Sequence, residues 1–314
     1  FFGLSIQSFA GTRREKCLSV WSVSVLIFYA AMVIWVFSMV EIANANIYVQ
    51  FQQLFSMWSV FITCLFILFL TVTQREHEVK FWSLVERLER IIGHFVDVKQ
   101  FNRMIALKIC FFITVPVLSQ VLAFATAVIR GDKYGAAIII ATFIPRLVFW
   151  LFTMKFIYFV DTLSFILRRI TQNLSSTRDY KEFSKCHTLC WRMSRTIEDG
   201  FGWGLVATLL CSFLTSFHYG YLICVDLING QLNFIPFVRM ILNLIRLFAL
   251  ADSCEKCTNN TSAIATVIFS INSKDFHSAA ESLGLQLLHQ PIVFEPKDLF
   301  RIDHASFISV RKNV

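Results

Sequence analysis

Charged side chains are scarce in this sequence. They make up 16% of its 314 residues, whereas soluble domains average about 25%. Hydrophobic residues reach 56%, and the mean hydropathy is +0.61. This balance favours a chain whose main solvent is lipid rather than water.

The residues that break helices are also few. The chain has only 11 glycines and 5 prolines, against 34 phenylalanines. Long Phe, Leu, Ile and Val runs without breakers are typical of membrane helices. These runs do not alternate between polar and apolar residues, as membrane strands would. We therefore expect an all-α membrane protein that forms a single transmembrane domain over residues 1–314.

Motifs for catalysis, metals and export are missing as well. We find no glycine-rich phosphate loop, hydrolase elbow or zinc-protease helix, so we expect neither an enzyme nor a cofactor. The closest cysteine spacings are Cys254 with Cys257, and Cys186 with Cys190, which flank His187. A zinc site needs about four ligands, so we expect ordinary thiols and no metal. The first ten residues lack basic side chains ahead of their apolar part, so we expect no cleavable signal peptide. The chain begins with Phe1, which suggests a fragment.

Six apolar runs have the length of membrane spans. A helix needs about 20 residues to cross the ~30 Å hydrocarbon core. The apolar pattern of the fourth run continues to Ile170, so we expect that helix to project beyond the bilayer. The expected spans are residues 21–43, 54–73, 105–129, 136–160, 204–227 and 234–251. The segments 75–104, 161–203 and 252–294 are expected outside the membrane.

Segment 75–104 has the pattern of an amphipathic helix. Its charges alternate in sign, and apolar residues recur at steps of three or four. The expected stripe is Trp82, Val85, Leu88, Ile92 and Phe95. Two interpretations remain open, since the stripe could cover this protein's own helices or contact another subunit.

Basic residues indicate the topology. Three lie in the N-terminal lead, six in 75–104, seven in 168–203 and six in 253–314, whereas the opposite links contain only Arg130 and Lys133. The positive-inside rule therefore predicts a cytosolic N-terminus, with an even number of crossings in this chain. The net charge of +8 is thus interpreted as a topology signal, and no nucleic-acid partner is expected.

The least generic stretch runs from Leu283 to Phe294, followed by Leu299-Phe300-Arg301-Ile302-Asp303. It resembles the insect gustatory receptors, in which a similar Leu-Gln-Leu-Leu-His run precedes a Phe-Phe-x-Ile/Leu-Asp segment. We expect His289 to be a polar group in helix packing, and not a base or a metal ligand. The motif positions are Leu285, Gln286, Leu287, Leu288, His289, Phe294, Phe300 and Asp303.

The resemblance implies a fold and a function. It implies a subunit of a homo- or hetero-tetrameric ligand-gated cation channel, in the lipid of the plasma membrane, that detects small-molecule tastants. It also implies a ligand pocket in the outer half of the membrane helices. The family's final helix, with its Thr-Tyr and Gln-Phe signature, does not follow Val310. We therefore expect a truncated chain that lacks the pore-lining helix.

Aromatic and polar residues in the expected outer half are the candidate ligand contacts, because small-molecule sites combine apolar walls with a few polar groups. Arg146 lies near mid-span, where a charge needs a partner or water. Arg239, Asn243 and Arg246 share one helix face, which is expected to turn inward. The candidates are Trp58, Gln120, Phe124, Arg146, Phe149, Trp150, His218, Tyr219, Tyr221, Phe237 and Arg239.

Three other functions compete. A G-protein-coupled receptor predicts an external N-terminus and seven spans, which the basic residues disfavour. A transporter predicts internal repeats and helices broken at mid-membrane. No repeat is clear, although Pro116 and Pro145 could interrupt helices. An inactive product of a receptor gene would give no current until the missing helix is restored.

Overall fold

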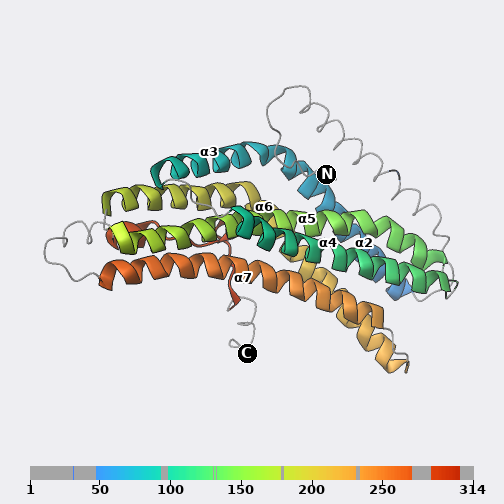
Figure 1. Cartoon of the computed structure of the whole chain (residues 1–314). Helices are drawn as coiled ribbons and strands as arrows, with labels where there is room; N and C mark the ends of the chain where they lie inside the picture. Colours follow the sequence, from blue (N-terminus) through green and yellow to red (C-terminus); the bar gives the residue numbers. More distant parts are fainter. Residues whose placement is uncertain are drawn as a thin grey trace. The chain divides into compact units, whose positions relative to one another are not determined.

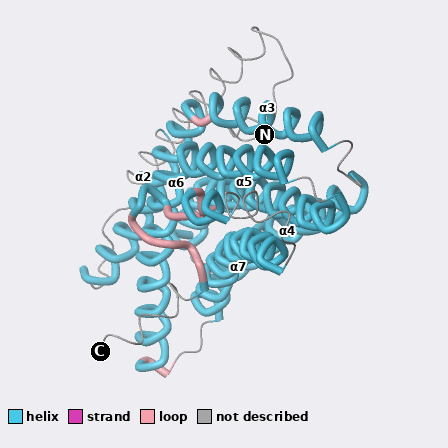
Figure 2. The backbone as a smooth tube through the Cα atoms, turned by 90° about the vertical axis from the view of Figure 1, so that its left-hand side faces the viewer, coloured by secondary structure: helices cyan, strands magenta, loops and turns pink. Residues whose placement is uncertain are grey.

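Long α-helices dominate the computed structural model (Figure 1). It describes residues 31, 47–92, 98–129, 131, 133–177, 180–230, 234–270 and 284–304. The first expected span, 21–43, and the basic N-terminal lead lie outside these residues, apart from residue 31. The helices are α2 (Ile47–Thr73), α3 (Arg75–Ile92), α4 (Val98–Ile129), α5 (Lys133–Thr177), α6 (Tyr180–Ile228) and α7 (Phe234–Ser270), with a 3-10 turn, η2 (Pro296–Asp298). The described backbone is otherwise loop, without strands (Figure 2). The expected all-α class is confirmed.

Among the described residues, four helical segments are long and apolar enough to cross a membrane. They are Ile105–Ile129, Thr142–Gln172, Glu182–Ile228 and Phe234–Thr266. A fifth crossing is added if the consecutive segments Trp58–Thr71 and Arg75–Ile91 are counted together as one broken span. The third expected span, 105–129, lies within α4 and coincides with one of these candidates, and its crossing of a membrane stays a prediction.

The helices of the second half of the chain extend well beyond one bilayer. α5 has 45 residues and α6 has 49. At about 1.5 Å per residue, each is roughly 65–75 Å long. The fourth helix does continue past Ile170, as α5 ends at Thr177, and its projection beyond the bilayer stays a prediction. The same continuity joins segment 180–203 to the fifth expected span, because α6 continues without a break across both.

The two prolines that could interrupt helices do not. Pro116 lies inside α4 and Pro145 inside α5, and both helices are continuous. The Ser119 hydroxyl donates a 2.8 Å hydrogen bond to the carbonyl oxygen of Pro116. This continuity does not match the broken helices that a transporter would need.

The chain divides into two compact units. Unit 1 comprises residues 1–75, 106–154 and 204–247, and unit 2 comprises 76–105, 155–203 and 248–314. The helices α4, α5, α6 and α7 each contribute one part to each unit. The internal boundaries of unit 2 fall close to those of the segments expected outside the membrane, 75–104, 161–203 and 252–294. The single-domain expectation stays a prediction.

In unit 1, α5 and α6 approach each other closely at Gly204. A Cβ placed on this glycine would lie only 2.3 Å from Cζ of Phe152, whose side chain is fully buried. Any larger residue at position 204 would therefore displace the ring. The glycine allows α6 to pack closely against α5 beside Phe152. This contact restricts the rotation of α6 about its own axis within the unit.

Aromatic side chains form the core of unit 2. The ring centroids of Phe81 and Phe159 are 4.7 Å apart, and those of Phe159 and Phe201 are 5.4 Å apart. Phe156 lies 5.8 Å from Phe201 and 6.0 Å from Phe294 on the same measure. These spacings are typical of edge-to-face aromatic packing. The core thus joins α3, α5 and α6 to the chain that follows α7.

Helix α3 differs in two ways from the amphipathic segment expected at 75–104. It ends at Ile92, and α4 begins at Val98. Its most buried apolar side chains are Phe81, Leu84 and Leu88, so only Leu88 of the expected stripe belongs to this set. Trp82 and Val85 are half-buried, whereas Ile92 and Phe95 lie outside the side chains described. The prediction misplaced the stripe because Phe81, with a fully buried ring, rotates the inner face of the helix by one residue.

The inner face of α3 covers this protein's own helices. α3 runs beside the first half of α6 (Figure 1), and a Cβ on Gly200 would touch His77 at 3.0 Å. Lys155 of α5 also forms an ion pair with Glu78, with the two side chains 13% and 12% exposed. The buried face of α3 therefore packs against α5 and α6 of the same chain.

Candidate functional site

A cavity in unit 1 brings together side chains from the five described helices α2, α4, α5, α6 and α7. Val60 comes from α2, Gln120 from α4, Arg146 from α5, Tyr219 from α6 and Arg239 from α7. Except for Val60, these residues lie within helices of membrane-crossing length. Six of the eleven expected ligand contacts line the cavity, namely Gln120, Arg146, Phe149, Trp150, Tyr219 and Arg239.

The cavity is small, with about 70 Å³ open to the centres of water-sized molecules. One buried water needs roughly 10–15 Å³ on this measure. The space therefore accommodates a few waters or one compact organic group. A larger ligand would have to displace side chains.

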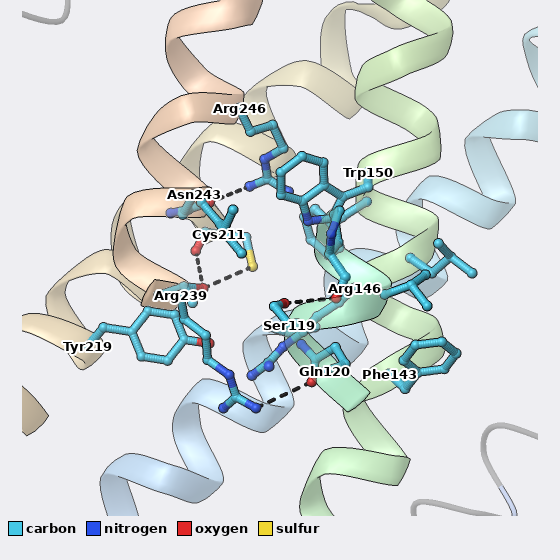
Figure 3. A pocket seen from close by; sticks show the side chains of 17 residues that line it. Ser119, Gln120, Phe143, Arg146, Trp150, Cys211, Tyr219, Arg239, Asn243 and Arg246 are labelled. Atoms are coloured by element: carbon cyan, nitrogen blue, oxygen red, sulfur yellow. Dashed lines mark hydrogen bonds between the residues drawn. The ribbon is translucent and has the colours of Figure 1, made fainter. Parts of the chain in front are cut away.

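One wall of the cavity is a hydrogen-bonded network between α6 and α7. The amide nitrogen of Asn243 donates to the Ser212 carbonyl oxygen at 2.8 Å and to the Ser216 hydroxyl at 2.7 Å. Arg246 Nη2 donates to the Asn243 side-chain oxygen at 2.7 Å and to the Ser212 hydroxyl. The network holds both side chains in fixed orientations at the edge of the cavity (Figure 3).

Aromatic rings support the same arginine from α5. The guanidinium carbon of Arg246 lies 5.6 Å from the ring centroids of both Phe149 and Trp150. A cation over an aromatic face is stabilised by the ring quadrupole, most strongly where water is excluded. Arg246, Phe149 and Trp150 are all buried, so this contact forms in a dry environment.

Two further arginines reach the opposite part of the cavity. Arg239 Nη2 donates to the side-chain oxygen of Gln120 at 3.3 Å. Figure 3 shows Arg146 extending towards the same space as Arg239 and Gln120. The expected inward turn of Arg239, Asn243 and Arg246 is confirmed, because all three line this one cavity.

Five of the expected contacts lie elsewhere. Phe124 lines a separate apolar cavity of about 260 Å³, which shares Gln120 and Phe143 with the first. Trp58 and Phe237 are 39% and 46% exposed on the protein surface. His218 and Tyr221 are half-buried, and the His218 ring lies 5.7 Å from that of Tyr219. These five residues lie on the same helices as the cavity-lining residues but do not line this cavity.

The cavity also contains residues that the candidate list omitted. Cys211 and Thr215 precede Tyr219 by eight and four residues on α6, and all three line the cavity. Asn243 and Arg246 complete the set on α7. Positions four apart share a helix face, so stepping back by fours from Tyr219 would have found the first two.

The cysteine clusters provide no metal centre in the described residues. Cys186, Cys190, Cys254 and Cys257 are buried free thiols, and no group of three potential metal ligands occurs in the described part of the chain.

Comparison with known proteins decides the family. A family model described as "7tm Chemosensory receptor" matches residues 2–310. This chain belongs to the 7tm chemosensory receptor family. It is therefore a multi-pass membrane receptor-family protein and not an enzyme.

Solved structures share the fold of this receptor. One is the insect olfactory receptor OR5 from Machilis hrabei in complex with eugenol, with a TM-score of 0.66 and 9% identity over 98% of this chain and 90% of that one. Another structure of the same olfactory receptor gives a TM-score of 0.60 and 11% identity, over 97% and 88% of the two chains. No curated protein matches the receptor sequence.

The family motif is anchored in unit 2 of the receptor. Residues 284–289 are helical, and Gln286 is fixed by α6. Its amide nitrogen donates to the Ser184 carbonyl oxygen at 3.1 Å and to the Thr188 hydroxyl at 2.7 Å, while the Ser184 hydroxyl donates to its side-chain oxygen. One motif glutamine therefore satisfies its polar atoms across helices far apart in sequence.

The chain after the motif helix continues this packing. Phe294 is 2% exposed, and its carbonyl oxygen accepts a 2.9 Å hydrogen bond from the backbone nitrogen of Ile302. The backbone nitrogen of Glu295 donates to the Glu198 carboxylate at 2.7 Å. The motif segment thus folds back onto α5 and α6.

The remaining motif positions divide between burial and exposure. Leu287 is buried, whereas Leu285, Leu288 and Phe300 are exposed at 53%, 74% and 38%. His289 is also exposed, so the expectation that it packs between helices is wrong within this chain. His289 follows the exposed Leu288, and both side chains lie on the exposed side of the short helix. Asp303 forms a 3.4 Å ion pair with Arg301.

Proposed function

We propose that this chain is a gustatory receptor, a subunit of a tetrameric ligand-gated cation channel that opens on binding a small-molecule tastant. The family match supports a chemosensory role. The resemblance of the Leu285–Phe294 motif to gustatory receptors supports taste. The single observation that carries ligand detection is the unit 1 cavity, where aromatic walls and oriented polar groups converge inside membrane-length helices.

We propose that the chain lies in the plasma membrane with a cytosolic N-terminus. The excess of basic residues in segments 75–104, 168–203 and 253–314 supports this orientation. Those segments nearly coincide with unit 2. In this orientation the basic segments face the cytosol, where subunits of a homo- or hetero-tetramer would associate.

The ligand is a compact molecule of partly apolar character. Eugenol, the ligand in one olfactory receptor structure of this fold, is a small molecule of partly apolar character. The cavity described above accepts one compact group without rearrangement. The residues proposed to contact it are those that line the cavity, with Gln120, Tyr219 and Arg239 as polar partners and Phe149 and Trp150 as apolar ones. Phe124, Trp58, Phe237, His218 and Tyr221 are proposed only as surrounding groups.

The test is to record currents from cells that express the receptor, alone and with other gustatory receptor subunits, against a tastant panel. We expect a cation current that begins without a G-protein delay. Trp150→Ala should shift the half-maximal ligand concentration upward by about tenfold or more, since it removes an apolar wall. Arg90→Gln, an exposed change on α3, is the matched control and should have no effect.

Two outcomes would contradict the proposal. A response abolished by G-protein inhibitors would identify a G-protein-coupled receptor instead. Saturable uptake of the tastant without a cation current would identify a transporter.

A further inference from the structure

The charges around the unit 1 cavity do not balance. Arg146, Arg239 and Arg246 line it, and no aspartate or glutamate is among the lining residues. In the described part of unit 1, Asp226 is the sole acidic residue. It lies on α6, seven residues beyond Tyr219, and does not line the cavity. Three positive groups therefore share one small space, and no carboxylate of the described part of unit 1 lines it.

The hydrogen-bond partners that the described residues offer Arg239 and Arg246 are neutral groups. Arg239 donates to the amide oxygen of Gln120, and Arg246 donates to the amide oxygen of Asn243 and to the Ser212 hydroxyl. A guanidinium stays protonated in proteins. The hydrogen bonds thus orient the arginines but leave their charge uncompensated.

The arginines also retain unused donors. Among the described residues, no hydrogen-bond acceptor meets Arg146 Nη1, Arg239 Nε or Arg246 Nε, although all three atoms are buried. The Arg246 side chain is 5% exposed. A buried charge with free donors is costly unless an anion or water satisfies it. All three side chains line the same cavity, so one bound acceptor group could serve more than one of them.

The aromatic part of the cavity wall indicates that the rest of the ligand is apolar. Phe143, Phe149 and Trp150 provide apolar and aromatic surface from α5. Arginine binds planar oxyanions through paired N–H groups, with strong, charge-assisted hydrogen bonds. We infer that the cavity takes a ligand that carries an oxyanion, typified by a carboxylate, on a compact apolar body. This inference rests on the proposed function, because it assigns a chemical class to the same ligand site.

Two sources could supply that chemistry, a free organic acid or the headgroup of an anionic lipid. The small volume of the cavity, about 70 Å³, admits a single compact group in either case. The experiment must therefore separate the sources by the lipid that surrounds the protein.

The test uses the purified receptor in nanodiscs made only of phosphatidylcholine. Benzoate and its neutral analogues benzamide and benzyl alcohol are titrated while the midpoint of thermal unfolding is followed. Benzoate should raise the midpoint and bind at least about tenfold more tightly than either neutral analogue, since only it can form charge-assisted hydrogen bonds. Arg146→Gln, Arg239→Gln and Arg246→Gln should each weaken benzoate binding by about tenfold or more, whereas Arg90→Gln should leave it unchanged.

Two further measurements distinguish a loss of ligand binding from a failure of the variant to fold. Arg146→Gln should raise the unfolding midpoint of the ligand-free receptor, because it relieves repulsion between like charges, whereas loss of a merely structural arginine would lower it. Arg246→Lys keeps the charge and should retain a preference for benzoate over benzamide. The same measurements are repeated in nanodiscs that contain phosphatidylglycerol. The lipid is a source of the oxyanion if it raises the unfolding midpoint only when the three arginines are present and if it competes with benzoate.

Several results would overturn the inference. Benzamide or benzyl alcohol binding as tightly as benzoate, with loss of binding in Trp150→Ala, would leave the small-molecule site standing and refute the anion preference. Benzoate binding that is unchanged by the three glutamine variants would place the anion elsewhere. A complete lack of binding by acids, neutral analogues and anionic lipid would refute both the inference and the proposed ligand site.

Discussion

The guanidinium carbon of Arg246 lies 5.6 Å from the centroid of the Trp150 ring, which connects α7 to α5 at the edge of the cavity. Both side chains are buried, at 5% and 8% exposed. The contact is therefore a cation–π interaction shielded from water, and it sets the position of the most deeply buried charge in the cavity. Phe149 faces the same guanidinium at an equal distance of 5.6 Å.

Replacing the indole should weaken unit 1. We expect Trp150→Leu to lower the free energy of unfolding by about 2–4 kcal/mol, since it removes the cation–π contact and leaves a cavity. Chemical unfolding in detergent micelles would measure the loss. The control is Trp203→Leu, because Trp203 is 54% exposed and should change stability by less than about 0.5 kcal/mol. Equal losses in the two variants would contradict the assignment.

Asn243 offers a test of both hydrogen bonding and charge. Asn243→Ala removes bonds to Ser212, Ser216 and Arg246, so it should lower the free energy of unfolding by about 1–3 kcal/mol. Asn243→Asp keeps the shape and places a carboxylate beside Arg246. We expect it to be more stable than Asn243→Ala and to reduce benzoate affinity, because it supplies the missing negative charge. An unchanged benzoate affinity in Asn243→Asp would contradict the charge argument.

Gly204 should tolerate no side chain. A Cβ there would lie 2.3 Å from Cζ of Phe152, so Gly204→Ala should destabilise the receptor by about 1–3 kcal/mol. Shortening the partner in Gly204→Ala with Phe152→Leu should recover part of the loss, as a double-mutant cycle would measure. Gly220 is the matched control on the same helix, because nothing lies within 4 Å of a Cβ built there. Gly220→Ala should be neutral or stabilising by about 0.5–1 kcal/mol.

Removing one partner of the Glu78–Lys155 ion pair should lower the free energy of unfolding more than replacing both partners by apolar residues. The side chains are 12% and 13% exposed, so Lys155→Met should cost about 3–5 kcal/mol by leaving a buried carboxylate without this partner. Replacing both, in Glu78→Leu with Lys155→Met, should restore most of the loss. Unfolding free energies of the two single variants and the double variant would measure the coupling. A double variant as unstable as the single ones would show that other contacts of these residues dominate.

Gln286 should hold the motif segment on α6. Gln286→Ala removes its hydrogen bonds to Ser184 and Thr188. We expect faster amide hydrogen exchange in residues 284–303, measured by mass spectrometry, with little change in the unit 1 cavity. Leu288→Ala is the control, because Leu288 is 74% exposed and its loss should leave exchange unchanged. Equal exchange in the two variants would mean that the buried Phe294 alone anchors the segment.

The apolar runs predicted helices well because the transfer of a run of about 20 residues into lipid depends on that run alone. The expected run 105–129 lies within α4, Val98–Ile129, and ends at the same residue. The stripe on α3 was misplaced because its inner face depends on the partner helix. Phe81 packs 4.7 Å from Phe159 of α5, and no local pattern contains that information.

In the candidate site, too, local patterns predicted some features, whereas contacts between helices decided others. The steps from Arg239 to Asn243 to Arg246 predicted an inward polar face, since residues three and four apart lie on one side of any helix. The list of expected ligand contacts stays a prediction, but only part of it lines the cavity. Trp58 and Phe237 are exposed, whereas Cys211 and Thr215, absent from the list, line the cavity. Aromatic character does not distinguish a surface that faces lipid from one that faces a cavity.

By itself the sequence determined that this is a helical membrane protein, that its charges are distributed asymmetrically, and that its C-terminal motif resembles gustatory receptors. These properties follow from composition and from the order of neighbouring residues. Only the tertiary structure decided which side chains share a cavity. Gln120 and Arg239 are 119 residues apart in the chain and hydrogen-bond at 3.3 Å. Their meeting depends on how each helix is rotated about its axis, which close contacts between helices, such as that of Gly204 with Phe152, determine.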